Sequence, residues 1–319
     1  MTYMAFDTPV TLSGPCRAPR QMLASQEYGG HKSIHDDSMA AEFGFRGAPI
    51  EGPTHFSQFV PLMHRLWGGR EWEANGCISA HYQNPVIDGE EVRVFVETTE
   101  RPNYARIRAE KRDGTPVLEG SATLGPDHPE TALEERRRKL ASPERLIILR
   151  DVEVGYRGAR GAVKMDFDTN LGALYPFTLR QKLEVITERS AWCTPEGGPR
   201  SPWGRAIVPL EMMGPLTQYT SHEARIPVRG PSVGLFADLE IRMVNGPVFV
   251  GKEYAIEREV VQFSESRRTE SYWVLTSLID PDDGMLVAQA LLNNAVLKAS
   301  FASYAEEAAA WERDVGEGG

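Results

Sequence analysis

The feature that most constrains the fold is an internal repeat: landmarks in the first half of this 319-residue chain return in the same order in the second half. Each copy has a glycine and an isoleucine before an apolar run, then an asparagine-led turn, then an Asp-Gly turn between strands. The matched landmarks are Gly47-x-x-Ile50 with Gly204-x-x-Ile207, Asn84 to Gly89 with Asn245 to Gly251, and Asp113-Gly114 with Asp283-Gly284. The repeat predicts two related units, residues 1–125 and 151–319, joined by a charged linker helix within 126–150.

Within the first copy, a predicted helix is followed by an antiparallel meander. Apolar residues of the run Pro53 to Trp67 recur with a period near 3.6, which predicts a helix with one buried face. Pro53 suits a first helical turn, and the Gly68-Gly69 pair ends the helix. Alternating apolar and polar residues predict strands at 77–82, 91–97, 105–110 and 117–124. This order is typical of the α+β class, with a second helix expected at 208–220.

The composition is that of a globular protein without a membrane segment. No run reaches the about 18 apolar residues of a membrane-spanning helix, and the first residues lack a basic-then-apolar leader. The three cysteines are far apart, which favours reduced thiols in a cytoplasmic protein. A net charge of −10 disfavours nucleic acid as a partner. Because the sequence has neither a CxxC pair nor a dinucleotide-binding fingerprint, we expect no metal and no redox cofactor.

The stretch from Tyr28 to Pro53 is the candidate functional site. Two histidines and two adjacent carboxylates lie close together in it, those of His31, His35, Asp36 and Asp37. A glycine-bearing loop then leads into the predicted helix, where free backbone N–H groups meet the positive end of the helix dipole. Such a helix start can stabilise a developing negative charge on a bound ligand.

The same stretch resembles the MaoC-like family of R-specific enoyl-thioester hydratases and dehydratases. The matching residues are Ile34-His35, followed by five residues and Ala41, then Gly44-Phe45 and Ile50-Glu51-Gly52. The resemblance implies a double hotdog fold, two tandem units that each wrap an antiparallel sheet around a long helix. It also implies a hydro-lyase that acts on an enoyl or 3-hydroxyacyl thioester, with coenzyme A or a carrier protein as the carrier and no cofactor. His35 would be the catalytic imidazole, and the N–H of Gly52 would bind the thioester carbonyl oxygen.

The motif departs from the family pattern at three places, one of which is Lys32-Ser33, where the family has Asn-Pro. Gly30 stands where the family has its catalytic aspartate, and Glu51 stands where it has a histidine. Asp36, Glu51, Glu211 or His31 could take over the aspartate's role. Glu211 is included because bacterial fatty-acid dehydratases of this fold place their acid on a helix of the partner domain.

Other residues near the motif have more than one interpretation. Asp37 suits a cap for the segment 38–43 or a partner that fixes His35. Gly47 and Ile50 belong to the loop before the helix. His55, one turn beyond Gly52, either lines the pocket or belongs to the core, and His64 is expected to be structural.

The histidines separate the two copies, because most of them precede residue 100 and only His222 falls in the second repeat. The first copy is therefore expected to keep the chemistry and to form most of the pocket. The second would be a scaffold or a pocket for a bulky acyl group. Trp192, Trp203 and the Met212-Met213 pair would then be its adaptable apolar walls or ordinary core.

Two other functions fit the sequence. A hotdog acyl thioesterase would use a carboxylate to activate water, and the Gly52 N–H would again bind the carbonyl oxygen. A non-catalytic acyl-binding or scaffold protein would need neither group.

The basic run Arg136 to Lys139 is either a phosphate clamp or a solvated face paired with Glu134 and Glu135. We expect a small-molecule partner, an acyl thioester, and the homodimer is a candidate assembly.

Overall fold

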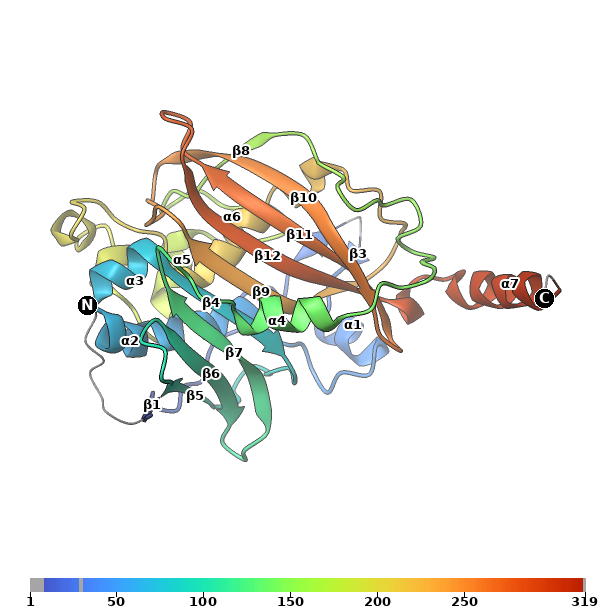
Figure 1. The fold of residues 1–319 in the computed structure, drawn as a ribbon, viewed down its shortest axis with the longest axis horizontal. Helices are drawn as coiled ribbons and strands as arrows, with labels where there is room; N and C mark the ends of the chain where they lie inside the picture. Colours follow the sequence, from blue (N-terminus) through green and yellow to red (C-terminus); the bar gives the residue numbers. More distant parts are fainter. Residues whose placement is uncertain (1–8, 29–30, 318–319) are drawn as a thin grey trace.

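The computed structural model describes residues 9–28 and 31–317, and its centre is a ten-stranded antiparallel sheet (Figure 1). The strands of the first half are β1 (Thr11–Ser13), β4 (Gly76–Tyr82), β5 (Val92–Thr98), β6 (Tyr104–Lys111) and β7 (Pro116–Leu124). Those of the second half are β8 (Gly161–Lys164), β9 (Gly234–Met243), β10 (Glu253–Glu265), β11 (Thr269–Ile279) and β12 (Leu286–Leu297). Their order in the sheet is β1-β5-β6-β7-β4-β9-β12-β11-β10-β8, so each half contributes one continuous block.

The two blocks meet where β4 pairs with β9, in a register that places Ile78 opposite Ile241. Outward from this seam, the strands of each half follow the same sequence of neighbours: β4, β7, β6, β5, β1 on one side and β9, β12, β11, β10, β8 on the other. Pairing at the seam covers one edge of each block, which would otherwise expose unpaired backbone groups.

Hydrogen bonds reproduce the sequence repeat. The amide Nδ2 of Asn84 donates to the carbonyl of Pro116 at 2.8 Å, and that of Asn245 donates to the carbonyl of Leu286 at 2.9 Å. Both asparagines therefore fasten a turn to a neighbouring strand in the same way. The N–H of Ile50 bonds to Val86 O (2.7 Å), as that of Val208 bonds to Val248 O (2.8 Å). The structural counterpart of Ile50 is thus Val208, one residue beyond the Ile207 matched by sequence.

The first predicted helix is present, as a 3-10 turn η1 (Gly52–His55) that continues into α2 (Phe56–Trp67). The side chains of Phe56, Phe59 and Met63 are fully buried in the main core with those of the seam strands. The helix ends at Gly68, whose φ of 86° favours glycine. A further helix, α3 (Gly69–Asn75), follows at once and was not predicted.

In the second half, the predicted helix is shorter and consists of η4 (Leu210–Met212) and α6 (Met213–Gln218). η4 contacts both η1 and α2. Gly214 lies so close to the first half that a Cβ atom on it would be 3.0 Å from Pro53 Cγ. The expectation that the two helical segments pack against each other is confirmed.

The charged linker forms α4 (Ala132–Lys139), which crosses the outer face of the sheet (Figure 1). A capping box between Thr131 and Glu134 begins it. Its basic residues are paired within the protein: Arg136 with Asp238 (3.1 Å), Arg138 with Glu130 (2.7 Å) and Lys139 with Glu135 (2.6 Å). The run is therefore a helix face paired within the protein, but only Lys139 uses a predicted partner, since Glu134 instead pairs with Arg242 (2.8 Å).

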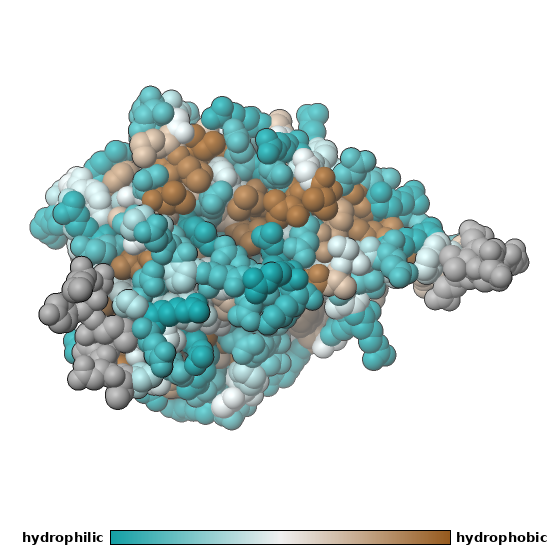
Figure 2. Space-filling model, in the orientation of Figure 1, coloured by the Kyte–Doolittle hydropathy of each residue, from teal (hydrophilic) through white to brown (hydrophobic). Residues whose placement is uncertain are grey.

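The remaining elements are α1 (Asp37–Glu42), α5 (Leu179–Val185), α7 (Tyr304–Glu317), the two-stranded ribbon β2 (Glu27–Tyr28) and β3 (His31–Lys32), and the short turns η2 (Ala191–Cys193), η3 (Gly198–Arg200), η5 (Ser221–Ala224) and η6 (Lys298–Ser300). α7 extends away from the body of the molecule (Figure 1). The outer face is mostly hydrophilic, with hydrophobic patches over the second-half strands (Figure 2). Within the described ranges, no helix combines the length and the apolar character needed to cross a membrane.

Candidate active site

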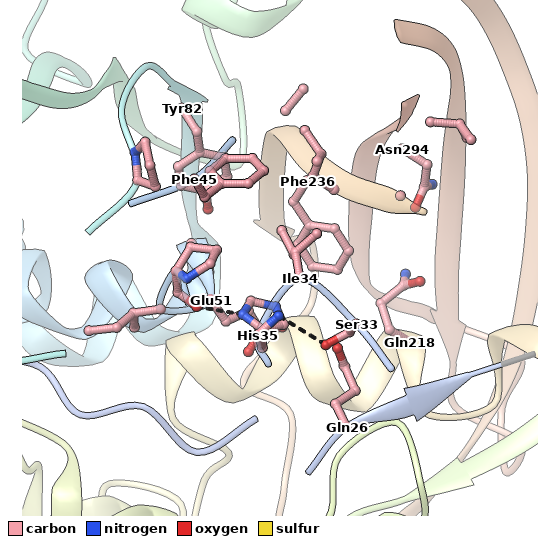
Figure 3. Close-up of a pocket in the computed structure, with 18 of the residues that line it drawn as sticks. Gln26, Ser33, Ile34, His35, Phe45, Glu51, Tyr82, Gln218, Phe236 and Asn294 are labelled. Atoms are coloured by element: carbon pink, nitrogen blue, oxygen red, sulfur yellow. Dashed lines mark hydrogen bonds between the residues drawn. The ribbon is translucent and has the colours of Figure 1, made fainter. Parts of the chain in front are cut away.

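A cavity of about 860 Å³ lies where the two halves meet (Figure 3). From the first half, the residues around it include His35, Ile50, Glu51, Gly52, His55 and Tyr82. From the second half, they include Tyr175, Gln218, Phe236, Tyr272 and Asn294. The halves contribute to its walls about equally, so the expectation of a pocket formed mainly by the first copy is wrong. The reason is the seam, which brings the second-half loops and strands over the first-half motif.

His35 is held in one orientation inside this cavity. Its ring Nδ1 lies 2.5 Å from the carbonyl oxygen of Pro49, and its backbone N–H donates to Ser33 Oγ at 3.1 Å. Because a carbonyl oxygen can only accept, Nδ1 carries the proton and Nε2 keeps the lone pair. Burial lowers the pKa of His35 to about 4, although the Pro49 carbonyl favours the charged form. His35 is therefore a neutral imidazole at physiological pH, able to accept a proton.

Glu51 is the carboxylate of this cavity, and Tyr175 of the second half holds it. The Tyr175 hydroxyl donates to Glu51 Oε1 at 2.8 Å. Burial raises the pKa of Glu51 to about 7, opposed by the positive charge of Lys182 and by the Tyr175 hydrogen bond. A carboxyl group with this pKa can be protonated or ionised near neutral pH, as an acid–base catalyst requires.

Glu211 and Lys182 form a buried ion pair behind the cavity. Lys182 Nζ, from α5, lies 2.9 Å from Glu211 Oε1, from η4, and 3.4 Å from Thr54 Oγ1 of the first half. Both charged side chains are almost completely buried. Glu211 is therefore engaged with Lys182 and does not line the cavity, while the Lys182 charge acts on Glu51.

Gly52 begins the 3-10 turn η1, so its N–H has no acceptor within that turn. The ring of Tyr82 lies directly against it: a Cβ atom on residue 52 would be 2.5 Å from Tyr82 Cζ. No side chain fits there without displacing the ring. The Tyr82 hydroxyl is buried and has no hydrogen-bond partner among the described residues.

We expect Gly52→Ala to lower the free energy of unfolding by about 1–3 kcal/mol, the usual cost of overpacking. Tyr82→Leu in the same chain should recover part of that loss, because it removes the ring atoms that the new methyl group meets. Urea unfolding of both single variants and the double variant measures the coupling. Additive effects of the two substitutions would contradict the contact.

His55 also lines the cavity, but it is packed differently from His35. Its side chain is buried, and Nδ1 has no hydrogen-bond partner in the described part of the chain. Burial lowers its pKa to about 4, with further lowering from the positive charges of Lys182 and Lys111. The structure therefore places His55 in the wall of the cavity, which is one of the two alternatives predicted for it.

The two adjacent aspartates lie outside the cavity wall. Asp36 is the N-cap of α1, where its side chain accepts from the N–H groups of Ser38 and Met39. Asp37 Oδ1 accepts from the N–H of Ala48 at 2.9 Å and so fastens the loop before the helix. Asp36, and not the predicted Asp37, is therefore the cap of this helix.

The other predicted residues divide between the cavity and the supporting loop. Ile50 lines the cavity. Gly47 packs against Ile87, whose Cγ2 would lie 3.2 Å from a Cβ atom at residue 47. His31 belongs to β3, but its side chain is outside the described part of the structure, and so is Gly30.

Most of the second-half contribution to the site is not visible in the sequence. Tyr175, Lys182, Gln218, Phe236 and Asn294 come from five separate segments, none of which carries a local motif. One signal was available: Lys182 is a lysine within an otherwise buried helical face between Leu179 and Leu183. A lysine in such a position usually has a buried partner.

Among the described residues, no three histidine, cysteine, aspartate or glutamate side chains converge as metal ligands would.

No protein-family model matches this chain, and a search of curated proteins finds no match. Solved structures do match. A protein from Chloroflexus aurantiacus, assigned as a MaoC domain dehydratase, aligns with a TM-score of 0.58 and 13% identity over 92% of this chain and 95% of that chain. RV0216 of Mycobacterium tuberculosis, described as having a double hotdog fold, aligns with a TM-score of 0.53 and 13% identity over 92% of this chain and 97% of that chain.

These likenesses, at low identity, concern the fold. Together with the paired helices and the seam, they show that the chain has a double hotdog fold of the α+β class.

Proposed function

We propose that this protein is a hydro-lyase that interconverts an enoyl thioester and a 3-hydroxyacyl thioester, carried on coenzyme A or a carrier protein. One observation carries the proposal: His35, Glu51 and the start of η1 at Gly52 line the same cavity. They supply a base, an acid and a hydrogen-bond donor for an enolate oxygen, which are the three groups that hydration of an enoyl thioester requires.

In the hydration direction, His35 Nε2 accepts a proton from a water molecule while the water oxygen forms a bond to C3. The C2–C3 π electrons move towards the thioester carbonyl and generate an enolate, whose oxygen accepts a hydrogen bond from the Gly52 N–H. Protonated Glu51 then gives its proton to C2. His35 is left protonated and Glu51 ionised, and transfer of one proton from the first to the second restores the starting state. Dehydration uses the same steps in reverse.

This scheme predicts a bell-shaped pH dependence. The pair is active when His35 is neutral and Glu51 is protonated, so kcat/KM should fall below about pH 4 and again above about pH 7, where each group changes state. Initial rates across this range test it, with thermal unfolding at each pH as the control for stability. A profile that stays flat from pH 5 to 9 would argue against Glu51 as the acid.

The reaction class is tested with crotonyl-CoA and a series of saturated acyl-CoAs. The proposal expects loss of the conjugated enoyl absorbance of crotonyl-CoA without release of free thiol. Thiol release from the saturated compounds, without hydration, would instead identify a thioesterase. Binding without either reaction would identify an acyl-binding protein.

A further inference from the structure

A second cavity, of about 820 Å³, adjoins the first on the side of the second half. The two share one wall, made of Leu174, Gln218, Ser221, Val228, Tyr272 and Asn294. Gln218 and Asn294 lie on the side of the first cavity that is remote from Glu51 (Figure 3). The second cavity therefore lies next to the part of the first cavity that is remote from Glu51.

Arg258, on β10, lines the second cavity and is its buried charge, while Glu27, Glu223 and Arg225 of the same wall are exposed. It occupies an inward position of β10 between Ile256 and Val260, and it is only 5% exposed. Its Nη2 donates to the carbonyl of Thr217 and to Thr220 Oγ1, both at 2.8 Å. These neutral acceptors fix the guanidinium group without neutralising it.

The buried guanidinium of Arg258 has no ion-pair partner among the described residues. Arg258 Nε is buried without a hydrogen-bond partner, and no carboxylate of the described residues lies within ion-pair distance of Arg258. Glu223, which acts on it electrostatically, is exposed to solvent. The contrast is Arg242, which pairs with both Glu134 (2.8 Å) and Glu240 (2.9 Å). A buried charge in a protein is normally paired, so the unpaired one at Arg258 indicates an anionic ligand.

We propose that Arg258 binds a carboxylate at the far end of the acyl group, so that the substrate is the thioester of a dicarboxylic acid. This inference rests on the proposed function for the position of the thioester. The planar guanidinium, which Thr217 and Thr220 hold in place, suits a planar carboxylate. An alternative source of the same charge is a phosphate group of the carrier.

Matched pairs of saturated acyl-CoAs distinguish these possibilities, because each pair differs only in the terminal carboxylate: succinyl-CoA with butyryl-CoA, and adipoyl-CoA with hexanoyl-CoA. Calorimetric titration should show that in at least one pair the carboxylated compound binds roughly tenfold to a hundredfold more tightly, the usual value of a hydrogen bond to a charged group. Arg258→Gln should abolish that preference. Arg225→Gln, an exposed arginine at the same cavity, is the matched control and should retain it.

Three results would overturn the inference. Equal weakening of both members of a pair by Arg258→Gln would place a carrier phosphate at Arg258. Unchanged binding by a folded Arg258→Gln variant would show that Arg258 does not contact the ligand. Its role would then be limited to its hydrogen bonds with Thr217 and Thr220. If the variant does not fold, the wild-type protein still decides, because equal affinity within every pair excludes a carboxylate site.

The test is independent of turnover, since saturated acyl-CoAs cannot be hydrated. If neither crotonyl-CoA nor glutaconyl-CoA, an enoyl thioester with a terminal carboxylate, is hydrated but the carboxylate preference depends on Arg258, only the reaction is wrong. If hydration depends on His35 but the preference is absent, only the assignment of Arg258 is wrong.

Discussion

Replacing His35 with alanine is expected to reduce turnover of an enoyl thioester at least about a hundredfold, the usual contribution of a general base. The variant loses Nε2, the atom that accepts the proton from water, and the Nδ1 contact to Pro49 O. His35→Gln tests the base more narrowly, because its amide can still bond to a backbone carbonyl but cannot accept the proton at neutral pH. Steady-state kinetics with crotonyl-CoA and circular dichroism of each variant measure activity and folding separately.

His64→Ala is the control for histidine replacement in the same half. His64 lies on α2, and its Nε2 contacts Glu73 Oε1 at 2.8 Å, away from the cavity wall. We expect a stability loss of about 1 kcal/mol and little change in turnover. Near wild-type turnover by His35→Ala on the true substrate would move the chemistry away from His35 and favour the thioesterase or binding-protein alternative.

Glu51→Gln is expected to produce a loss comparable to that of His35→Ala, about a hundredfold or more. Glutamine has nearly the same shape and can still accept the hydrogen bond from Tyr175, so the cavity wall should be preserved. It has no proton to give to C2. The alkaline limb of the pH profile near 7 should therefore disappear along with most of the activity.

Two other carboxylates provide contrasts for Glu51. Glu211→Gln leaves the buried Lys182 without its partner and should destabilise the protein by about 3–5 kcal/mol. Asp36→Asn preserves a capping side chain and should change stability and turnover little. A folded Asp36→Asn or Glu211→Gln variant with a hundredfold lower turnover, beside an active Glu51→Gln, would transfer the acid role to that residue.

Much of the fold was predictable because its signals are local and occur twice. The period of 3.6 in residues 53–67 predicted α2, and alternating residues predicted β4 to β7 to within one residue at each end. The order of the turns predicted the repeat. These patterns reflect burial of one helix or strand face, which depends mainly on neighbouring residues in the chain.

The site was predictable only on the side that carries the motif. His35 and Gly52 could be proposed from spacing, but nothing local to Glu51 indicates that Tyr175 bonds to it or that burial raises its pKa to about 7. Both effects depend on residues brought together by the seam. The sequence also does not show that Asp36, rather than the predicted Asp37, caps α1, because this depends on the backbone angles at Asp36.

Because β4 and β9 join two halves of one chain, the two halves need not be identical, as the subunits of a symmetric dimer must be. In a pair of identical subunits, every substitution appears twice, so a change that enlarges one binding site alters its twin as well. In this chain the starts of the two helical segments differ, since η1 begins with Gly52 and η4 begins with Leu210. The side chain of a leucine keeps a ligand farther from the backbone N–H than a glycine does. One end can thus be specialised for reaction and the other for holding the remainder of the substrate. A single chain of this kind can hold one long, asymmetric ligand where a symmetric pair would hold two short, identical ones.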